Sequence, residues 1–245
     1  DVRRNMLSDF TNVMRNGKIA MKLPEGVELV NARICTEDDD VMLVTDAGRA
    51  IRFRTTDVRV FKGRDSTGVR GIRLSNGDKV VSMAVIRHFE ASAEERAAYL
   101  KQRRLMAGVT EEGEEDEVAP GELSPERYAE MSAAEDLILT ITEGGQGKLS
   151  SSHDYPVRGR GGQGVAAMDK AMRGGEIVAA FPVLLEDQIM LATSKGQSIR
   201  CPVEGISFRS RSAGGVKVFN TGKGEEVVSV AWIADQGDEG DEAEE

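Results

Sequence analysis

The chain has 245 residues, of which 40% are apolar and only 4% aromatic, so its core must consist mainly of Val, Ile, Leu and Met. No apolar run approaches the ~18 residues that a helix needs to cross a bilayer, so the sequence predicts no membrane-spanning helix. Cys35 and Cys201 stand alone, which indicates reduced core residues of a cytoplasmic protein rather than a disulfide or a metal site. The chain starts with Asp and shows no signal peptide, so we expect a fragment of a longer protein.

The formal net charge of −10 is unevenly distributed along the chain. Residues 89–136 carry 14 acidic and 5 basic side chains, and residues 234–245 carry 7 acidic and no basic ones. The remainder of the chain therefore has a net charge of +6. A basic body with two acidic segments is compatible with a nucleic-acid-binding surface. A solvated surface with an excess of Arg is the simpler alternative.

An internal repeat of about 51 residues is the strongest pattern in the sequence. Four glycines anchor the repeat at intervals of 51, 96 and 51 residues, and the long interval is one period plus about the length of the segment 89–136. The anchors are Gly17, Gly68, Gly164 and Gly215. A large apolar residue follows each anchor by four positions, with a small one just before it; the pairs are Ala20-Met21, Gly71-Ile72, Ala167-Met168 and Val218-Phe219. We interpret these columns as core positions.

Each unit contains about four short strands joined by turns. Strand patterns begin at Val41, Leu137 and Ile189, and glycine-containing hairpin turns follow at 46–48 and 194–196. The pattern predicts an all-β, propeller-like array of four-stranded blades. Since one blade cannot bury its faces alone, adjacent blades must stack. We expect the last strand of one unit to pair into the next, in an open arc of three to four blades.

Between and beyond the blades lie two acidic segments. Residues 91–106 are rich in helix formers, and residues 124–134 begin with Ser124-Pro125, a typical helix N-terminus. We expect residues 110–118 to be mobile and residues 234–245 to be disordered. The predicted organisation is a partial blade at 1–40, blades at 41–88, 137–188 and 189–233, an acidic helical insertion at 89–136 and an acidic tail at 234–245.

Several motifs, in order and at the repeat spacing, resemble the C-terminal domain of the DNA gyrase A protein. They are Leu7-Ser-Asp-Phe10, Val41-Met-Leu-Val-Thr-Asp-Ala-Gly48, Asp65-Ser-Thr-Gly-Val-Arg-Gly-Ile-Arg-Leu74 and Gly77-Asp-Lys-Val-Val81. The resemblance covers residues 1–88 and 137–233. It implies a β-pinwheel of six blades with strands exchanged between neighbours, of which this chain supplies the later ones. It also implies a basic rim that bends and wraps double-stranded DNA, so that a type II topoisomerase introduces negative supercoils.

The resemblance has two departures. The family's Gln-Arg-Arg-Gly-Gly-Lys-Gly box is absent. Gln102-Arg103-Arg104 begins like it, but within a helical stretch, whereas the segment 158–164, Arg-Gly-Arg-Gly-Gly-Gln-Gly, is a closer echo just before a repeat anchor. The insertion at 89–136 is not general to the family, and its role stays open.

No catalytic centre is evident in the sequence. Tyr128 follows Arg127, as the DNA-cleaving tyrosine of gyrase follows an arginine, but it lacks the surrounding pattern, and Tyr99 and Tyr155 have no better claim. His88 and His153 are too isolated for a metal site or a catalytic pair. No P-loop is present. The resemblance therefore implies that Mg²⁺ and ATP are used elsewhere, in an A2B2 heterotetramer with the gyrase B protein.

Basic residues that recur near the same blade elements are the candidate DNA contacts, because they neutralise phosphates without reading bases. They are Arg3, Arg4, Arg15, Lys18, Lys22, Arg52, Arg54, Arg59, Lys62, Arg64, Arg70, Arg73, Arg158, Arg160, Arg200, Arg209, Arg211 and Lys217. Two alternatives remain: the C-terminal domain of the topoisomerase IV A protein, and a protein-binding propeller scaffold. The acidic tail either competes with DNA for this rim or only improves solubility.

Overall fold

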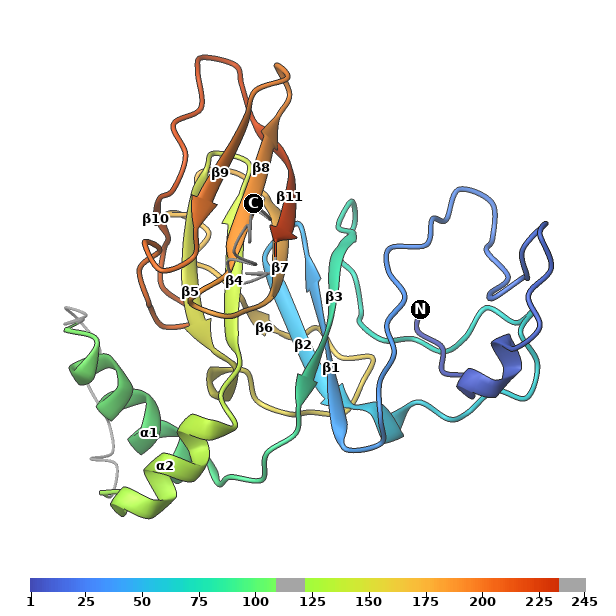
Figure 1. Ribbon diagram of the computed structural model, residues 1–245, viewed down its shortest axis with the longest axis horizontal. Helices are drawn as coiled ribbons and strands as arrows, with labels where there is room; N and C mark the ends of the chain where they lie inside the picture. The colour runs from blue at the N-terminus through green and yellow to red at the C-terminus, as the bar shows by residue number, and fades with distance from the viewer. Residues whose placement is uncertain (109–121, 234–245) are drawn as a thin grey trace, which may run out of the picture.

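The computed structural model describes residues 1–108 and 122–233, which contain three antiparallel sheets and one pair of helices (Figure 1). The strands are β1 (Asp39–Thr45), β2 (Arg49–Arg54), β3 (Val80–Arg87), β4 (Leu137–Thr142), β5 (Gln146–Ser151), β6 (Val165–Ala166), β7 (Ile177–Val183), β8 (Gln188–Thr193), β9 (Ser198–Pro202), β10 (Val216–Lys217) and β11 (Val227–Ile233). The helices are α1 (Ala93–Met106) and α2 (Pro125–Ala133), and single 3-10 turns occur at η1 (Leu7–Phe10), η2 (Thr55–Asp57) and η3 (Ser152–Asp154). The predicted all-β class with a partly helical insertion is confirmed.

The sheets are built by strand exchange. The first sheet has the order β3-β1-β2-β6, the second β10-β5-β4-β7 and the third β11-β8-β9. Strand β6 lies between β5 and β7 in the sequence but pairs with β2, and β10 lies between β9 and β11 but pairs with β5. Four-stranded blades are thus confirmed for the first two sheets. The expected direction of exchange was wrong, because each donated strand is the third of its unit and joins the preceding sheet.

Three of the four repeat-anchor glycines mark the places where the chain meets the backbone of the preceding unit, whereas Gly17 has open space around it. A Cβ added to Gly68 would lie 2.4 Å from the carbonyl oxygen of Val2, and one added to Gly164 would lie 2.3 Å from that of Ala50. At Gly215 the nearest atom would be the backbone nitrogen of Gly147, at 2.9 Å. Only glycine fits such an approach, which explains why this position recurs.

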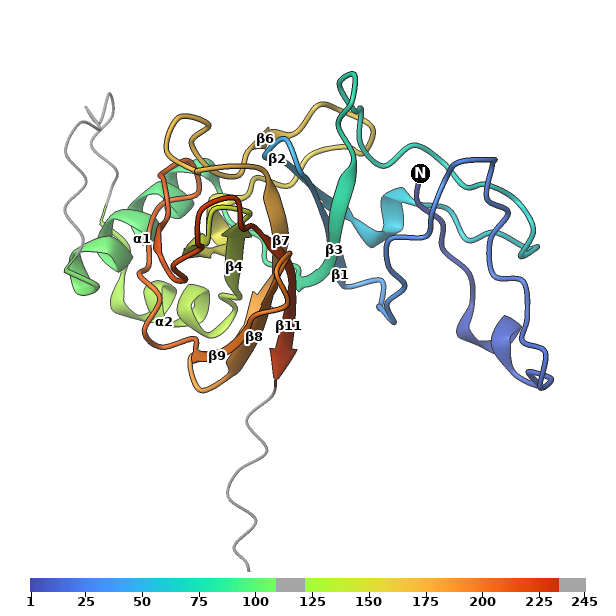
Figure 2. The same ribbon diagram turned by 90° about the horizontal axis from the view of Figure 1, so that it is seen from above.

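The core lies between stacked sheets, as predicted. Met42, Ile86 and Ile138 are buried in a cluster between the first and second sheets, together with the repeat residues Ala167 and Met168. A second cluster between the second and third sheets contains Leu139, Leu149 and Leu191, and Phe219 packs against it. Since neighbouring sheets share these clusters, no blade is an independent folding unit. Seen from above, the sheets form an open row rather than a ring (Figure 2).

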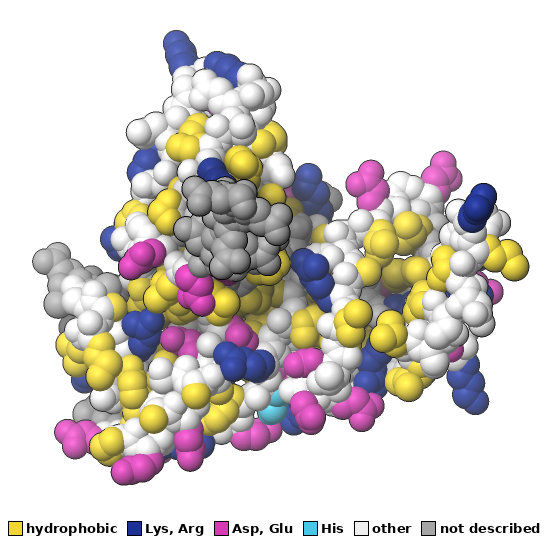
Figure 3. Space-filling model, viewed as in Figure 1, with side chains coloured by type: hydrophobic (Ala, Val, Ile, Leu, Met, Phe, Trp, Pro, Cys, Tyr) yellow, Lys and Arg dark blue, Asp and Glu magenta, His cyan; other side chains and the backbone are white. Residues whose placement is uncertain are grey.

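The first 38 residues form no sheet, in contrast to the partial blade expected there. They contact the rest of the chain through bridges such as Val2 with Val69 and Arg4 with Val60. Their large apolar side chains are exposed, including Met14 at 76% and Ile34 at 77%, and apolar side chains cover this end of the molecule in Figure 3. In the complete units, the strands equivalent to residues 29–36 are β3, β7 and β11, which pair with β1, β4 and β8. Residues 1–38 contain no strand equivalent to β1, β4 or β8, so residues 29–36 have no partner of this kind there.

The insertion forms a pair of helices, as its sequence predicts. Ser92 and Glu95 form a reciprocal capping box at the start of α1, and Ser124 caps α2 with Pro125 in the first turn. Tyr99 of α1 is buried against Tyr128 of α2, with 4.9 Å between the ring centroids. The expectations for residues 110–118 and 234–245 lie outside the described residues.

Candidate nucleic-acid interface

Three equivalent stretches of chain cross the outside of the molecule, and we call them the outer segments: residues 58–70, 155–166 and 206–217. Each follows the outer edge of the preceding unit through the same backbone contact. The amides of Phe61, Arg158 and Arg209 donate to the carbonyls of Arg4, Arg52 and Leu149, each at 2.8 Å. The outer segments contain nine basic residues and one acidic residue, Asp65. The repeat therefore brings basic residues to matching positions in successive units, such as Arg64, Arg160 and Arg211.

The predicted DNA contacts differ in exposure. Ten of them are exposed: Arg15, Lys22, Arg59, Lys62, Arg70, Arg73, Arg158, Arg160, Arg200 and Lys217. Seven are half-buried: Arg3, Arg4, Lys18, Arg54, Arg64, Arg209 and Arg211. The exposed members of the outer segments are Arg59, Lys62, Arg70, Arg158, Arg160 and Lys217, and of these Arg70 and Lys217 occupy the same repeat position. By contrast, carboxylates gather along the edge of the molecule near α2 and the base of β1 (Figure 3).

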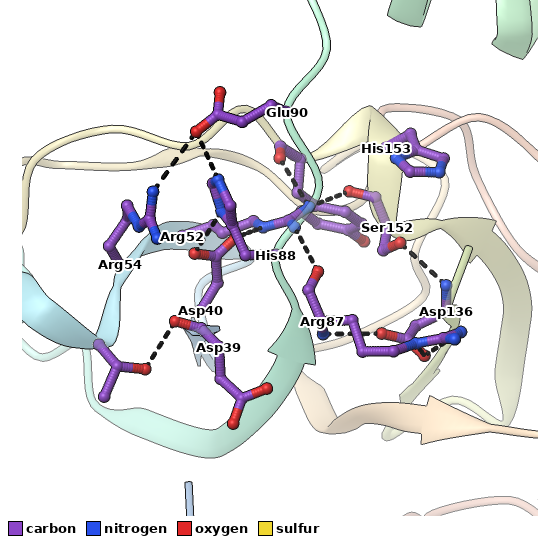
Figure 4. A network of polar contacts seen from close by, with 12 residues as sticks. Asp39, Asp40, Arg52, Arg54, Arg87, His88, Glu90, Asp136, Ser152 and His153 are labelled. Atoms are coloured by element: carbon purple, nitrogen blue, oxygen red, sulfur yellow. Dashed lines mark hydrogen bonds and ion pairs between the residues drawn. The ribbon is translucent and has the colours of Figure 1, made fainter. Parts of the chain in front are cut away.

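Arg52 does not belong to this surface, and its prediction as a DNA contact was wrong. Its side chain is only 4% exposed, and its Nε lies 2.8 Å from Oδ2 of the fully buried Asp40 (Figure 4). Its terminal nitrogens donate to the carbonyls of Ser152 and Arg87 at 2.6 and 3.1 Å. Burial lowers the pKa of the Arg52 guanidinium, and the Asp40 carboxylate opposes that shift. Arg52 thus joins the first and second sheets internally.

His88 extends this buried pair towards the insertion. Its Nδ1 lies 2.9 Å from Asp40 Oδ1, and its Nε2 lies 2.7 Å from a carboxylate oxygen of Glu90 (Figure 4). The hydrogen bond with His88 lowers the pKa of Glu90. The network links the start of the insertion to β1 and β2. Within the described ranges, no cluster of three or more His, Cys, Asp or Glu side chains is arranged to hold a metal ion.

The remaining sequence candidates for chemistry occupy packed surroundings. The Tyr128 hydroxyl contacts Met106 Sδ at 3.3 Å, and burial raises the pKa of Tyr128. His153 is buried, and its Nε2 contacts the Met131 carbonyl oxygen at 2.7 Å. Cys35 and Cys201 are half-buried free thiols whose pKa is raised by burial. In the part of the chain that the structure describes, no helix is both long and apolar enough to span a membrane.

Sequence reasoning missed two buried cations that join neighbouring units of the protein. Lys148 is fully buried, and its Nζ donates to the carbonyls of Ser210 and Ala213 in the third outer segment, at 2.9 and 2.7 Å. Arg173 is also buried and donates to the Ala47 carbonyl. Lys148 occupies the repeat position of Ile51. A single lysine at a position that is apolar in another unit gives no sequence signal of its own.

The fold defines a propeller-like repeat protein with strands exchanged between its blades. The chain belongs to the family described as DNA gyrase C-terminal domain, beta-propeller, whose model matches residues 7–36, 39–87, 136–183 and 187–231. These four segments follow the repeat and leave out the helical insertion. The chain is 46% identical over 262 aligned residues to the DNA gyrase A protein of Granulibacter bethesdensis, covering 99% of this chain but only 28% of that protein.

Two solved structures share the fold. A DNA gyrase A C-terminal domain matches with a TM-score of 0.62 at 21% identity, over 89% of this chain and 59% of that one. The C-terminal domain of a DNA topoisomerase IV matches with a TM-score of 0.66 at 19% identity, over 91% of this chain and 56% of that one. The fold alone does not separate gyrase from topoisomerase IV, whereas the family model and the Granulibacter relative both indicate gyrase.

Proposed function

We propose that this chain binds duplex DNA on its outer segments and bends it around them, as the wrapping part of a cytoplasmic DNA gyrase A protein. DNA cleavage, ATP hydrolysis and the use of Mg²⁺ then belong to the rest of an A2B2 enzyme with the gyrase B protein. On its own, the chain relaxes, cleaves and supercoils nothing.

The recurrence of the outer segments is the observation that carries this proposal. Three segments with the same backbone contact to the preceding unit hold nine basic residues and one acidic residue. Such a surface neutralises phosphates along a path and makes no demand on base sequence. Bending 20–30 bp of DNA costs roughly 1–6 kcal/mol, which several phosphate contacts spread along the arc offset.

The test is the salt dependence of binding to a labelled duplex of about 30 bp, measured between about 50 and 200 mM salt. We expect a steep loss of affinity with salt and equal affinities for unrelated sequences. Arg158→Ala should flatten the plot of log affinity against log salt by about 0.9, the value for one lost phosphate contact.

Lys170→Ala is the matched control, because Lys170 is exposed in the same unit but lies outside the outer segments. It should leave the slope unchanged. Absence of binding by the wild-type chain, or equal slopes for the two variants, would contradict the proposal. A protein-binding scaffold would show no binding to the duplex at all.

A further inference from the structure

An arginine at the same place in three successive units reaches back to the unit before it. Nη1 of Arg64 donates to the Ile19 carbonyl at 2.8 Å, and Nη1 of Arg160 donates to the Arg70 carbonyl at 3.0 Å. Nη1 of Arg211 donates to the Ala166 carbonyl. Each acceptor is the second residue after a repeat-anchor glycine. The contact is therefore a property of the repeat rather than of one loop.

Two of these arginines hold the preceding unit at a second point. Nε of Arg160 donates to the Asp57 carbonyl at 3.0 Å, and Nε of Arg211 donates to the Asp154 carbonyl at 2.9 Å. Asp57 and Asp154 are equivalent, since each ends the 3-10 turn just before an outer segment. Each guanidinium thus binds both ends of the preceding outer segment, 58–70 for Arg160 and 155–166 for Arg211.

The sequence around Arg160 makes such a contact necessary. Gly159, Gly161 and Gly162 surround it, and glycine-rich backbone has little conformational preference of its own. The shape of this loop must come from contacts with other segments. The backbone of Gly161 and Gly162 supplies two, from the Gly161 amide to the Gly71 carbonyl at 2.6 Å and from the Arg73 amide to the Gly162 carbonyl at 2.8 Å. The Arg160 side chain supplies two more.

We propose that Arg64, Arg160 and Arg211 are positioning residues that fix each outer segment on its neighbour, and so set the spacing of the groups that contact DNA. This proposal rests on the proposed function. The three arginines were among the predicted DNA contacts, and under this proposal they act mainly by positioning the chain rather than by neutralising phosphates. At Arg160 and Arg211 the planar guanidinium, with several donors in a fixed geometry, binds two carbonyls at once. A lysine in its place keeps the charge but not this geometry.

Arg160→Lys is the decisive variant, and Arg158→Lys is its matched control. Arg158 is exposed two residues away, and its side chain has no hydrogen bond or ion pair within residues 1–108 and 122–233. Hydrogen–deuterium exchange on the 245-residue chain without DNA is the first measurement. We expect roughly tenfold faster exchange of amides in 58–70 and 158–164 for Arg160→Lys, the size expected for losing about two hydrogen bonds. Arg158→Lys should match the wild type.

DNA bending is the second measurement, made by energy transfer between dyes at the two ends of a duplex. Arg160→Lys should lower the end-to-end transfer while leaving the salt slope unchanged. Arg158→Ala should flatten the salt slope and leave the end-to-end transfer unchanged. The proposal is overturned if Arg160→Lys bends DNA like the wild type.

The exchange experiment separates this proposal from the proposed function. If the wild-type chain fails to bind DNA, the proposed function fails, but the exchange difference still tests the positioning contacts. Should Arg160→Lys prove unfolded by circular dichroism, Arg211→Lys repeats the test at the equivalent position, where the guanidinium also binds two carbonyls. Wild-type exchange in 58–70 for a folded Arg160→Lys, or in 155–166 for a folded Arg211→Lys, overturns the positioning role.

Discussion

Arg52 and Asp40 form an ion pair 2.8 Å apart inside the molecule, whereas the equivalent arginine of the third sheet, Arg200, is exposed and bonds to Gln188. Strand registers establish the equivalence, because Arg52 lies opposite Met42 and Arg200 opposite Met190. The difference arises because the second unit covers β2, while within the described residues no strand covers the outer edge of β9. The same residue at the same repeat position therefore has two different roles.

We expect Arg52→Ala to lower the free energy of unfolding by about 3–5 kcal/mol, because it leaves the Asp40 carboxylate buried without its cation. Arg200→Ala, the matched control, should change it by less than about 0.5 kcal/mol. Urea denaturation of both variants measures the difference. Equal free energies of unfolding for the two variants would mean that removing the buried Arg52 costs no more than removing the exposed Arg200.

The repeat-anchor glycines provide a second stability test. Gly164 has a φ of +73° and Gly77 one of +79°, but only Gly164 has backbone atoms where a Cβ would lie. Gly77→Ala should cost about 1–2 kcal/mol, from the left-handed conformation alone. Gly164→Ala should cost a further 1–3 kcal/mol or so, since the new methyl group collides with Ala50. Thermal unfolding of the two variants checks this, and equal losses would show that contact between units does not explain the recurring glycine.

A pH dependence follows from His153. Burial lowers the pKa of His153 below its ordinary 6.5, with Arg52 acting in the same direction and Met131, Glu135 and Asp136 opposing it. Below about pH 6.5 the unfolded chain therefore binds a proton that the folded chain does not, and stability falls as pH falls. His153→Gln removes this titration. We expect the free energy of unfolding of the wild type to fall more than that of the variant between about pH 7.5 and 5.5. Parallel plots of this free energy against pH would contradict the role of His153.

How far the sequence predicts this molecule depends on whether a feature recurs. The 51-residue spacing and the paired columns such as Ala167-Met168 predicted blades and their stacking, because every unit must bury the same faces. The direction of strand exchange could not be predicted, since Val165–Ala166 is a two-residue strand whose sequence carries no information on its partner. The burial of Arg52 was equally hidden, because the pattern around it matches that around exposed Arg200.

Among the candidate DNA contacts, too, the sequence did not predict which side chains bind other parts of the protein. Arg158 and Arg160 had the same predicted role as DNA contacts, and both are exposed. Only the three-dimensional placement separates them, because the backbone carbonyls that bind Arg160 come from residues 90 and 103 positions away. Composition and charge predict where cations gather. They do not predict which cations are already engaged by the protein itself.

The acidic tail gives the last prediction. Residues 234–245 lie outside the described residues, but they follow Ile233, which pairs with Gln188, the residue to which Arg200 bonds. Two strand spacings of about 4.8 Å therefore separate β11, which ends at Ile233, from β9, which carries Arg200. Its seven carboxylates act within a Debye length of ~8 Å in physiological salt, and twelve residues reach at most about 40 Å.

If the tail competes with DNA for Arg200 and the third outer segment, deleting 234–245 should tighten duplex binding at low salt. The gain should fade as salt rises, because both attractions are screened. A tail of equal length with its Asp and Glu replaced by Asn and Gln should reproduce the gain, which separates charge from bulk. Arg200→Ala should make the gain from deletion smaller, because one target of the tail is gone. Binding curves at about 50 mM salt are measured for these proteins, with Arg200→Ala in both the full and the shortened chain, and equal affinities for the full and shortened wild-type chains would leave the tail without a role in DNA binding.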